Sequence, residues 1–131
     1  MSKVLVADDS RFQVQLLKTA LEQKGFEVVV AMDAAQTGIL ALRQAPDAIV
    51  LDVNMPGGSG IEVLKRLKRS TKTQRIPVVI VSGNQDAEVR QRAKELGVAV
   101  CFVKPVDTDQ LCDTLRGLLQ PRAVETTGAK P

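Results

Sequence analysis

Five short apolar runs, rich in β-branched residues, recur along the chain with little alternation between apolar and polar positions. Continuous apolar runs of this kind are typical of parallel strands that are covered by helices on both faces. The predicted strands are Lys3–Ala7, Phe26–Val30, Ala48–Leu51, Val78–Val81 and Ala99–Val103.

Each apolar run is followed by a segment in which apolar residues recur with a helical period. The first segment opens with Ser10 and Gln13, which have the spacing of an N-terminal capping box, and closes at Gly25. Its apolar positions are three or four residues apart, at Val14, Leu17 and Leu21. Caps and periodicity therefore predict the same helix.

Four further helices are predicted on the same grounds. The second runs from about Asp33 to Ala45, before Pro46, and is expected to pack through Ile39, Leu40 and Leu42. The third starts at Ser59, with Glu62 three residues later, and is expected to bury Ile61, Leu64 and Leu67. The last two are expected over Asp86–Leu96 and Thr108–Leu119.

Strict alternation of strand and helix predicts an α/β fold, a (βα)5 doubly wound parallel sheet with helices on both faces. The expected strand order is the flavodoxin-like 2-1-3-4-5. We expect residues 1–120 to form the domain. Residues 121–131 have no apolar period and are expected to be a disordered tail or the remnant of a linker.

The amino-acid composition excludes several classes of protein and of functional site. A chain of 131 residues with 44% hydrophobic and 25% charged residues is typical of one folded globular domain. It has no apolar stretch near the ~18–20 residues that span a bilayer, so we expect a cytoplasmic protein without a membrane segment. The absence of histidine excludes imidazole catalysis and Cys/His zinc sites.

Six lysines and arginines lie within residues 65–75 without one acidic residue, against a net charge of only +3. A basic cluster can bind nucleic acid, but the chain has no Tyr or Trp to stack on bases. The same residues fit the solvated face of the third helix and the loop after it. We favour that interpretation, and no nucleic-acid partner is expected for this chain.

Polar residues follow four of the five predicted strands: Asp8-Asp9, Asp52, Ser82-Gly83 and Lys104-Pro105. The second strand ends in Ala31-Met32 and is expected at the edge of the sheet. Ligands of open parallel sheets bind outside the carboxyl ends of the strands, so we expect the polar groups to converge on one pocket.

Three aspartates held close together repel one another unless a proton or a cation intervenes. Oxygen ligands without His or Cys select Mg²⁺ or Mn²⁺. Such a metal and the ammonium of Lys104 balance the three carboxylates, and the set suits the binding of a phosphoryl group.

These four motifs, in this order at the strand ends, together with Asn54-Met55-Pro56-Gly57 after Asp52, resemble the receiver domain of bacterial two-component response regulators of the chemotaxis-regulator type. The resemblance covers about residues 3–119. It implies that Asp52 accepts a phosphoryl group from the phosphohistidine of a sensor histidine kinase or a phosphotransfer protein.

The resemblance also implies roles for the other site residues. Asp8, Asp9, Asp52 and the main-chain carbonyl of Asn54 are expected to hold Mg²⁺. Lys104 is expected to contact the phosphoryl group and to precede a cis-proline, Pro105. Ser82 is expected to move toward a phosphoryl oxygen on activation, and small Gly83 leaves room for the group.

One position departs from the family pattern. Tyr or Phe usually stands three residues before the lysine, and this ring turns inward when the hydroxyl moves; here the residue is Cys101, beside Phe102. Val106 also replaces a common Phe. The phosphorylation chemistry is unaffected, but the usual aromatic relay is in doubt.

Simpler interpretations exist for single residues. Asp9 and Ser10 fit a helix cap, Lys104 a solvated charge, Ser82 a turn, and residues 57–60 the turn into the third helix rather than a phosphate loop. A carboxylate at the end of an apolar central strand is harder to explain without a function, which favours a role for Asp52.

We therefore expect a phospho-accepting signalling switch that alters the binding of an unidentified downstream effector, with dimerisation as one outcome, and not an enzyme. The alternative is a phosphohydrolase with an aspartate nucleophile. Asn54 stands where such enzymes typically have a second acid, which argues against it. A flavodoxin-like electron carrier is disfavoured because no Trp or Tyr is available to stack on a flavin.

Overall fold

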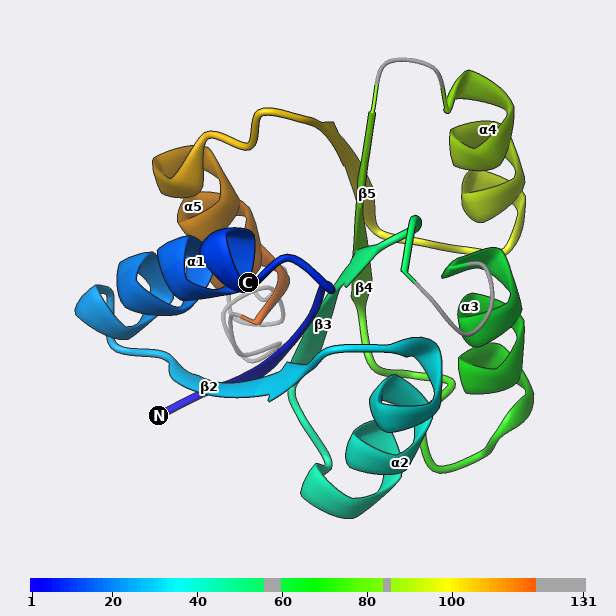
Figure 1. Ribbon diagram of the computed structural model, residues 1–131. Coiled ribbons are helices and arrows are strands. Elements are labelled where there is room, and N and C mark those ends of the chain that lie inside the picture. The colour runs from blue at the N-terminus through cyan, green and yellow to red at the C-terminus, as the bar shows by residue number, and fades with distance from the viewer. Residues whose placement is uncertain (56–59, 84–85, 120–131) are drawn as a thin grey trace, which may run out of the picture.

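The computed structural model describes residues 1–55, 60–83 and 86–119, which form a parallel sheet with helices on both faces (Figure 1). The strands are β1 (Lys3–Ala7), β2 (Glu27–Ala31), β3 (Ala48–Asp52), β4 (Val78–Ser82) and β5 (Val100–Val103). The helices are α1 (Arg11–Gln23), α2 (Ala34–Gln44), α3 (Gly60–Arg69), α4 (Ala87–Glu95) and α5 (Thr108–Leu118). The sheet order is β2-β1-β3-β4-β5, so the predicted fold and order are confirmed.

The sheet separates two apolar clusters, because successive side chains of a strand point to opposite faces. On one face α1 and α5 cover the cluster that contains Val4 and Val6 of β1; on the other, α2, α3 and α4 cover Leu5 and Ala7 (Figure 1). Every residue of β3 and β4 is buried. This double covering explains why the central strands read as unbroken apolar runs.

The ends of the strands differ slightly from the predicted ones. Strand β3 extends through Asp52 and β4 through Ser82, so both polar residues are the last residues of their strands. Strand β2 lies at an edge, as predicted, and runs one residue later than expected at both ends. Strand β5 begins at Val100, one residue later than expected.

The predicted buried face of α2 is wrong for two of its three residues. Ile39 and Leu42 are 50% and 51% exposed, and only Leu40 packs partly against the core. The buried residues are instead Ala34, Thr37 and Ala41. They are spaced at i, i+3 and i+7, and their small size lets the helix lie close to the sheet. The buried faces predicted for α1 and α3 are confirmed.

Some sequence predictions lie outside the described residues. These are the start of the third helix at Ser59, the turn over residues 57–59, and the tail over residues 121–131. Within the part of the chain that the structure describes, every helix is too short or too polar to cross a bilayer.

The start of α3 packs directly against the residue that follows Asp52. The N–H of Gly60 donates to the carbonyl of Val53 at 3.0 Å, and a Cβ on Gly60 would lie 2.5 Å from the Cα of Val53. Only glycine allows this approach, and it fixes the chain just beyond β3.

We predict that Gly60→Ala lowers the free energy of unfolding by about 2–3 kcal/mol, because the backbone of Val53 must move to admit the methyl group. The measurement is urea unfolding followed by circular dichroism.

The matched control is Gly38→Ala in α2, where a Cβ would meet nothing within 4 Å. This change is expected to be neutral or to stabilise by up to about 1 kcal/mol. Equal stabilities of the two variants would contradict the argument.

Candidate functional site

Three carboxylates meet at the carboxyl end of the sheet, as the sequence predicts. Asp8 and Asp9 follow β1, and Asp52 ends β3, the strand beside it. One oxygen from each lies within 4.8 Å of the others. Asp8 and Asp52 are each only 2% exposed, whereas Asp9 is exposed. The site therefore has two buried carboxylates and one that faces solvent.

The pKa of Asp8 is raised to about 6, chiefly by burial and also by the negative charge of Asp52. A hydrogen bond from the backbone N–H of Ser10 to Asp8 Oδ1, at 3.0 Å, and the charge of Lys104 act in the opposite direction. Ser10 also caps α1, since its Oγ accepts from the N–H of Gln13 at 3.2 Å. Only half of the predicted capping box forms, because Asp8 takes the Ser10 N–H.

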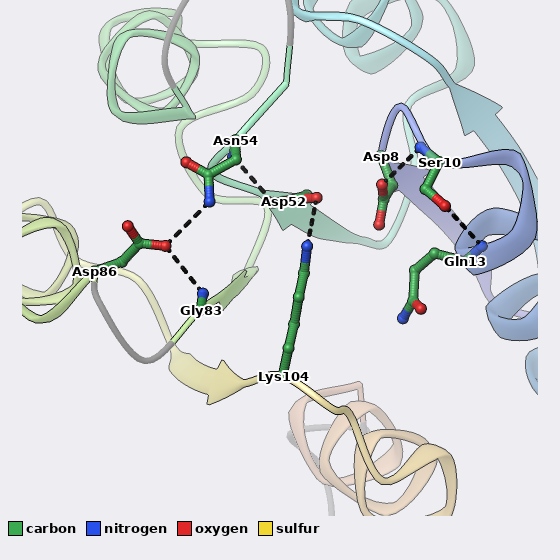
Figure 2. A network of polar contacts seen from close by, with 8 residues as sticks. All are labelled: Asp8, Ser10, Gln13, Asp52, Asn54, Gly83, Asp86 and Lys104. Atoms are coloured by element: carbon green, nitrogen blue, oxygen red, sulfur yellow. Dashed lines mark hydrogen bonds and ion pairs between the residues drawn. The ribbon is translucent and has the colours of Figure 1, made fainter.

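Lys104 reaches the carboxylate of Asp52 from the loop after β5 (Figure 2). Its Nζ donates to Asp52 Oδ2 at 3.1 Å, and the N–H of Asn54 donates to Asp52 Oδ1 at 2.9 Å. Burial lowers the pKa of Lys104, but the hydrogen bond and charge of Asp52 outweigh it and raise that pKa overall. Lys104 is thus an ion-pair partner of Asp52, and its peptide bond to Pro105 is cis, as predicted.

The donors of this cluster are hard oxygens with neither His nor Cys among them, a set that suits Mg²⁺ or Mn²⁺. The backbone N–H of Asn54 donates a hydrogen bond to Asp52, so Asn54 lies beside the carboxylate cluster. Coordination of a metal by the main-chain carbonyl of Asn54 stays a prediction.

Asp86 joins the two loops that follow β3 and β4, a role that the sequence analysis did not assign (Figure 2). Its Oδ2 accepts from the N–H of Gly83 at 2.9 Å and from the Nδ2 of Asn54 at 3.0 Å. Both hydrogen bonds lower the pKa of Asp86. Asp86 directly precedes α4, but its side chain makes no capping hydrogen bond to that helix.

Ser82 is a fully buried strand residue, not a turn residue. Its hydrogen-bond partner is a second contact that was not predicted from the sequence. Arg90 of α4 donates from Nη1 to Ser82 Oγ at 3.0 Å and to the carbonyl of Gly83 at 2.7 Å. No local pattern indicates this contact, since the arginine reads as an ordinary polar residue of an exposed helix.

Cys101 lies on the face of β5 that packs toward α2, α3 and α4, and it is partly buried. Burial raises the pKa of its thiol. Phe102 belongs to the opposite face, with α1 and α5, and cannot replace a ring at position 101. The departure from the family pattern at this position is therefore present in the structure.

Comparisons with known proteins agree with this arrangement. The family model described as "Response regulator receiver domain" matches residues 4–116. Sporulation initiation phosphotransferase F of Bacillus subtilis is 32% identical, over 89% of this chain and 93% of that protein. Protein PilH of Pseudomonas aeruginosa is 30% identical, over 91% and 98%.

Other relatives are longer or known from solved structures. Response regulator PleD of Caulobacter vibrioides is 35% identical over 94% of this chain, which spans only 27% of PleD. The structure of chemotaxis response regulator CheY4 of Vibrio cholerae is 31% identical, with a TM-score of 0.83 over 91% of this chain and 99% of that one. Fold, site geometry and sequence agree, and the chain belongs to the receiver domain family of two-component response regulators.

Proposed function

We propose that this receiver domain is a phospho-accepting switch in which Asp52 takes a phosphoryl group from the phosphohistidine of a sensor histidine kinase or a phosphotransfer protein. The observation that carries the proposal is the placement of Asp52: a buried carboxylate between two other carboxylates and the ammonium of Lys104. A similar protein from Bacillus subtilis is named as a phosphotransferase, which supports phosphoryl transfer as the chemistry.

In the transfer step, a carboxylate oxygen of Asp52 bonds to phosphorus while the P–N bond of the phosphohistidine breaks, and the imidazole leaves with the electrons of that bond. Asp8, Asp9, Asp52 and the carbonyl of Asn54 would hold Mg²⁺ or Mn²⁺. When bound, the metal supplies charge stabilisation to the phosphoryl oxygens. Lys104 would supply a further positive charge, and Ser82 and Gly83 would line the space beside the acceptor.

The consequence of transfer is a change in which partners bind, and we propose that the surface of α4, β5 and α5 carries it. Dimerisation is one form that the change can take. The protein would act in the cytoplasm as an acceptor, not as an enzyme that turns over separate substrates. The phosphohydrolase alternative has less support, because the side chain of Asn54 is bonded to Asp86 and supplies no acid beside Asp52.

We predict that Asp52→Asn abolishes labelling by acetyl phosphate, since an amide keeps the shape of the carboxylate but is a poor nucleophile. The measurement is the mass of the intact protein before and after incubation with acetyl phosphate and Mg²⁺.

The matched control is Asp47→Asn, an exposed carboxylate that precedes the same strand at its opposite end. It should be labelled like the parent. A base-labile label on the Asp52→Asn protein would disprove the assignment, and steady turnover of a phosphate ester would favour the phosphohydrolase.

We predict that Asp9→Ala weakens Mg²⁺ binding by about tenfold or more, because it removes one of three charged ligands while Ser10 still caps α1. Isothermal titration calorimetry measures the change. An unaltered Mg²⁺ affinity would mean that Asp9 is no ligand.

We predict that the ionisation of Asp8 costs the metal-free protein stability as the pH rises from about 4 to about 6. Because burial holds the pKa of Asp8 at about 6 in the folded state, above its ordinary value of 3.8, the folded chain binds the extra proton in that range. Asp8→Asn should reduce this loss in the free energy of unfolding by roughly 1–3 kcal/mol, because the asparagine side chain cannot ionise but can still accept the Ser10 N–H. Urea unfolding at several pH values measures it, and identical pH profiles for parent and variant would contradict it.

A further inference from the structure

Four hydrogen bonds from Asp86 and Arg90 attach α4 and the residue before it to the end of β4. Asp86, just before the helix, accepts from the N–H of Gly83 at 2.9 Å and donates its own N–H to the carbonyl of Gly83 at 3.1 Å. Arg90, in the first turn, donates both hydrogens of Nη1, to the carbonyl of Gly83 at 2.7 Å and to Ser82 Oγ at 3.0 Å. The helix therefore holds Gly83 at both its N–H and its carbonyl, and it holds the side chain of Ser82 through one guanidinium.

The hydroxyl of Ser82 has unused hydrogen-bonding capacity. It accepts from Arg90, but no residue in the described part of the chain accepts a hydrogen bond from its O–H, although the side chain is fully buried. Leaving a buried donor unsatisfied costs about 1–3 kcal/mol in general. Ser82 is one residue beyond Val81, which pairs with Asp52 between β4 and β3, so both Ser82 and Asp52 lie at the carboxyl end of the sheet. In the proposed function, an oxygen of the phosphoryl group on Asp52 is the acceptor for the Ser82 O–H.

If the Ser82 hydroxyl turns toward that oxygen, another residue must transmit the movement to the surface of α4. Position 101 has no aromatic ring to carry the signal, and Phe102 faces the other cluster. Arg90 touches Ser82 directly and belongs to α4 itself. The contact thus links the acceptor site to the proposed output surface without a ring.

We propose that Arg90 is the positioning residue that transmits the state of Ser82 to α4, an inference that rests on the proposed function. In the unphosphorylated domain Arg90 holds the Ser82 hydroxyl and fixes the first turn of α4. When the Ser82 side chain rotates to bring its O–H to the phosphoryl group, its Oγ moves out of reach of Arg90. Arg90 then keeps only its hydrogen bond to the carbonyl of Gly83, and the first turn of α4 loosens.

The test uses Arg90→Met, which keeps the length of the side chain but removes its donors. Beryllofluoride with Mg²⁺ serves as the phosphoryl mimic, its affinity is measured by calorimetry, and hydrogen exchange is measured over residues 87–95. In the parent, beryllofluoride should speed exchange in α4. In Arg90→Met, exchange should already be fast and should change little.

The affinity for beryllofluoride should rise about tenfold in Arg90→Met, because the variant no longer has a charge-assisted hydrogen bond that binding must break. In a Ser82→Ala background the same change should alter the affinity by less than about twofold, since the contact between the two side chains is already absent. A purely structural role for Arg90 would not depend on Ser82 in this way.

Two further variants complete the test. Arg92→Met is the matched control, since Arg92 lies on the same helix, is exposed, and makes no side-chain hydrogen bond or ion pair with the described residues; it should behave like the parent. Arg90→Lys keeps one donor group and should restore part of the exchange response. Circular dichroism confirms that each variant is folded.

The outcomes separate the inference from the function on which it rests. If beryllofluoride binds the parent no better than it binds Asp52→Asn, the proposed function fails and the inference fails with it. If the parent binds normally but Arg90→Met keeps the α4 response, or its affinity is unchanged, the inference alone is wrong. Weaker binding by Arg90→Met would also overturn it and would place Arg90 on the phosphoryl group itself.

Discussion

Asp8 and Asp52 are two buried carboxylates at the carboxyl end of the sheet. Burying two negative charges close together is unfavourable, and the neighbouring groups offset this cost. Desolvation and mutual repulsion disfavour two charges there, so the pKa of Asp8 rises and Lys104 forms an ion pair with Asp52. Backbone N–H groups of Ser10 and Asn54 supply one hydrogen bond to each carboxylate. A cation that bound this cluster would offset the repulsion between the carboxylates and so stabilise the fold.

The fold and most of the site were predictable from general rules about parallel sheets. Strands covered on both faces read as apolar runs, and their carboxyl ends meet at one edge, so the residues after four strands had to converge. Asp52 and Ser82 proved to be the last residues of their strands rather than the first of a loop. That shift of one residue matters, because sheet hydrogen bonds hold both residues more firmly than a loop would.

The failures have physical reasons. For α2, we predicted that the large apolar residues face the core. The helix instead packs against the sheet through small residues, and Ile39 and Leu42 are half exposed. The roles of Asp86 and Arg90 depend on the reach of a side chain across a loop, which no local periodicity records. Both residues looked like ordinary polar positions at the start of an amphipathic helix.

The contact between Gly60 and Val53 differs in kind from the contacts that hold the chain on the other side of Asp52. Beyond β3, the start of α3 packs against the backbone of Val53 with no room for one methyl group. On the side of β4, the neighbouring structure is held by a few hydrogen bonds of Asp86 and Arg90. The chain beyond β3 is therefore fixed by backbone packing, whereas the chain beyond β4 is fixed by side-chain hydrogen bonds, which a substitution of one side chain can remove without creating a steric clash.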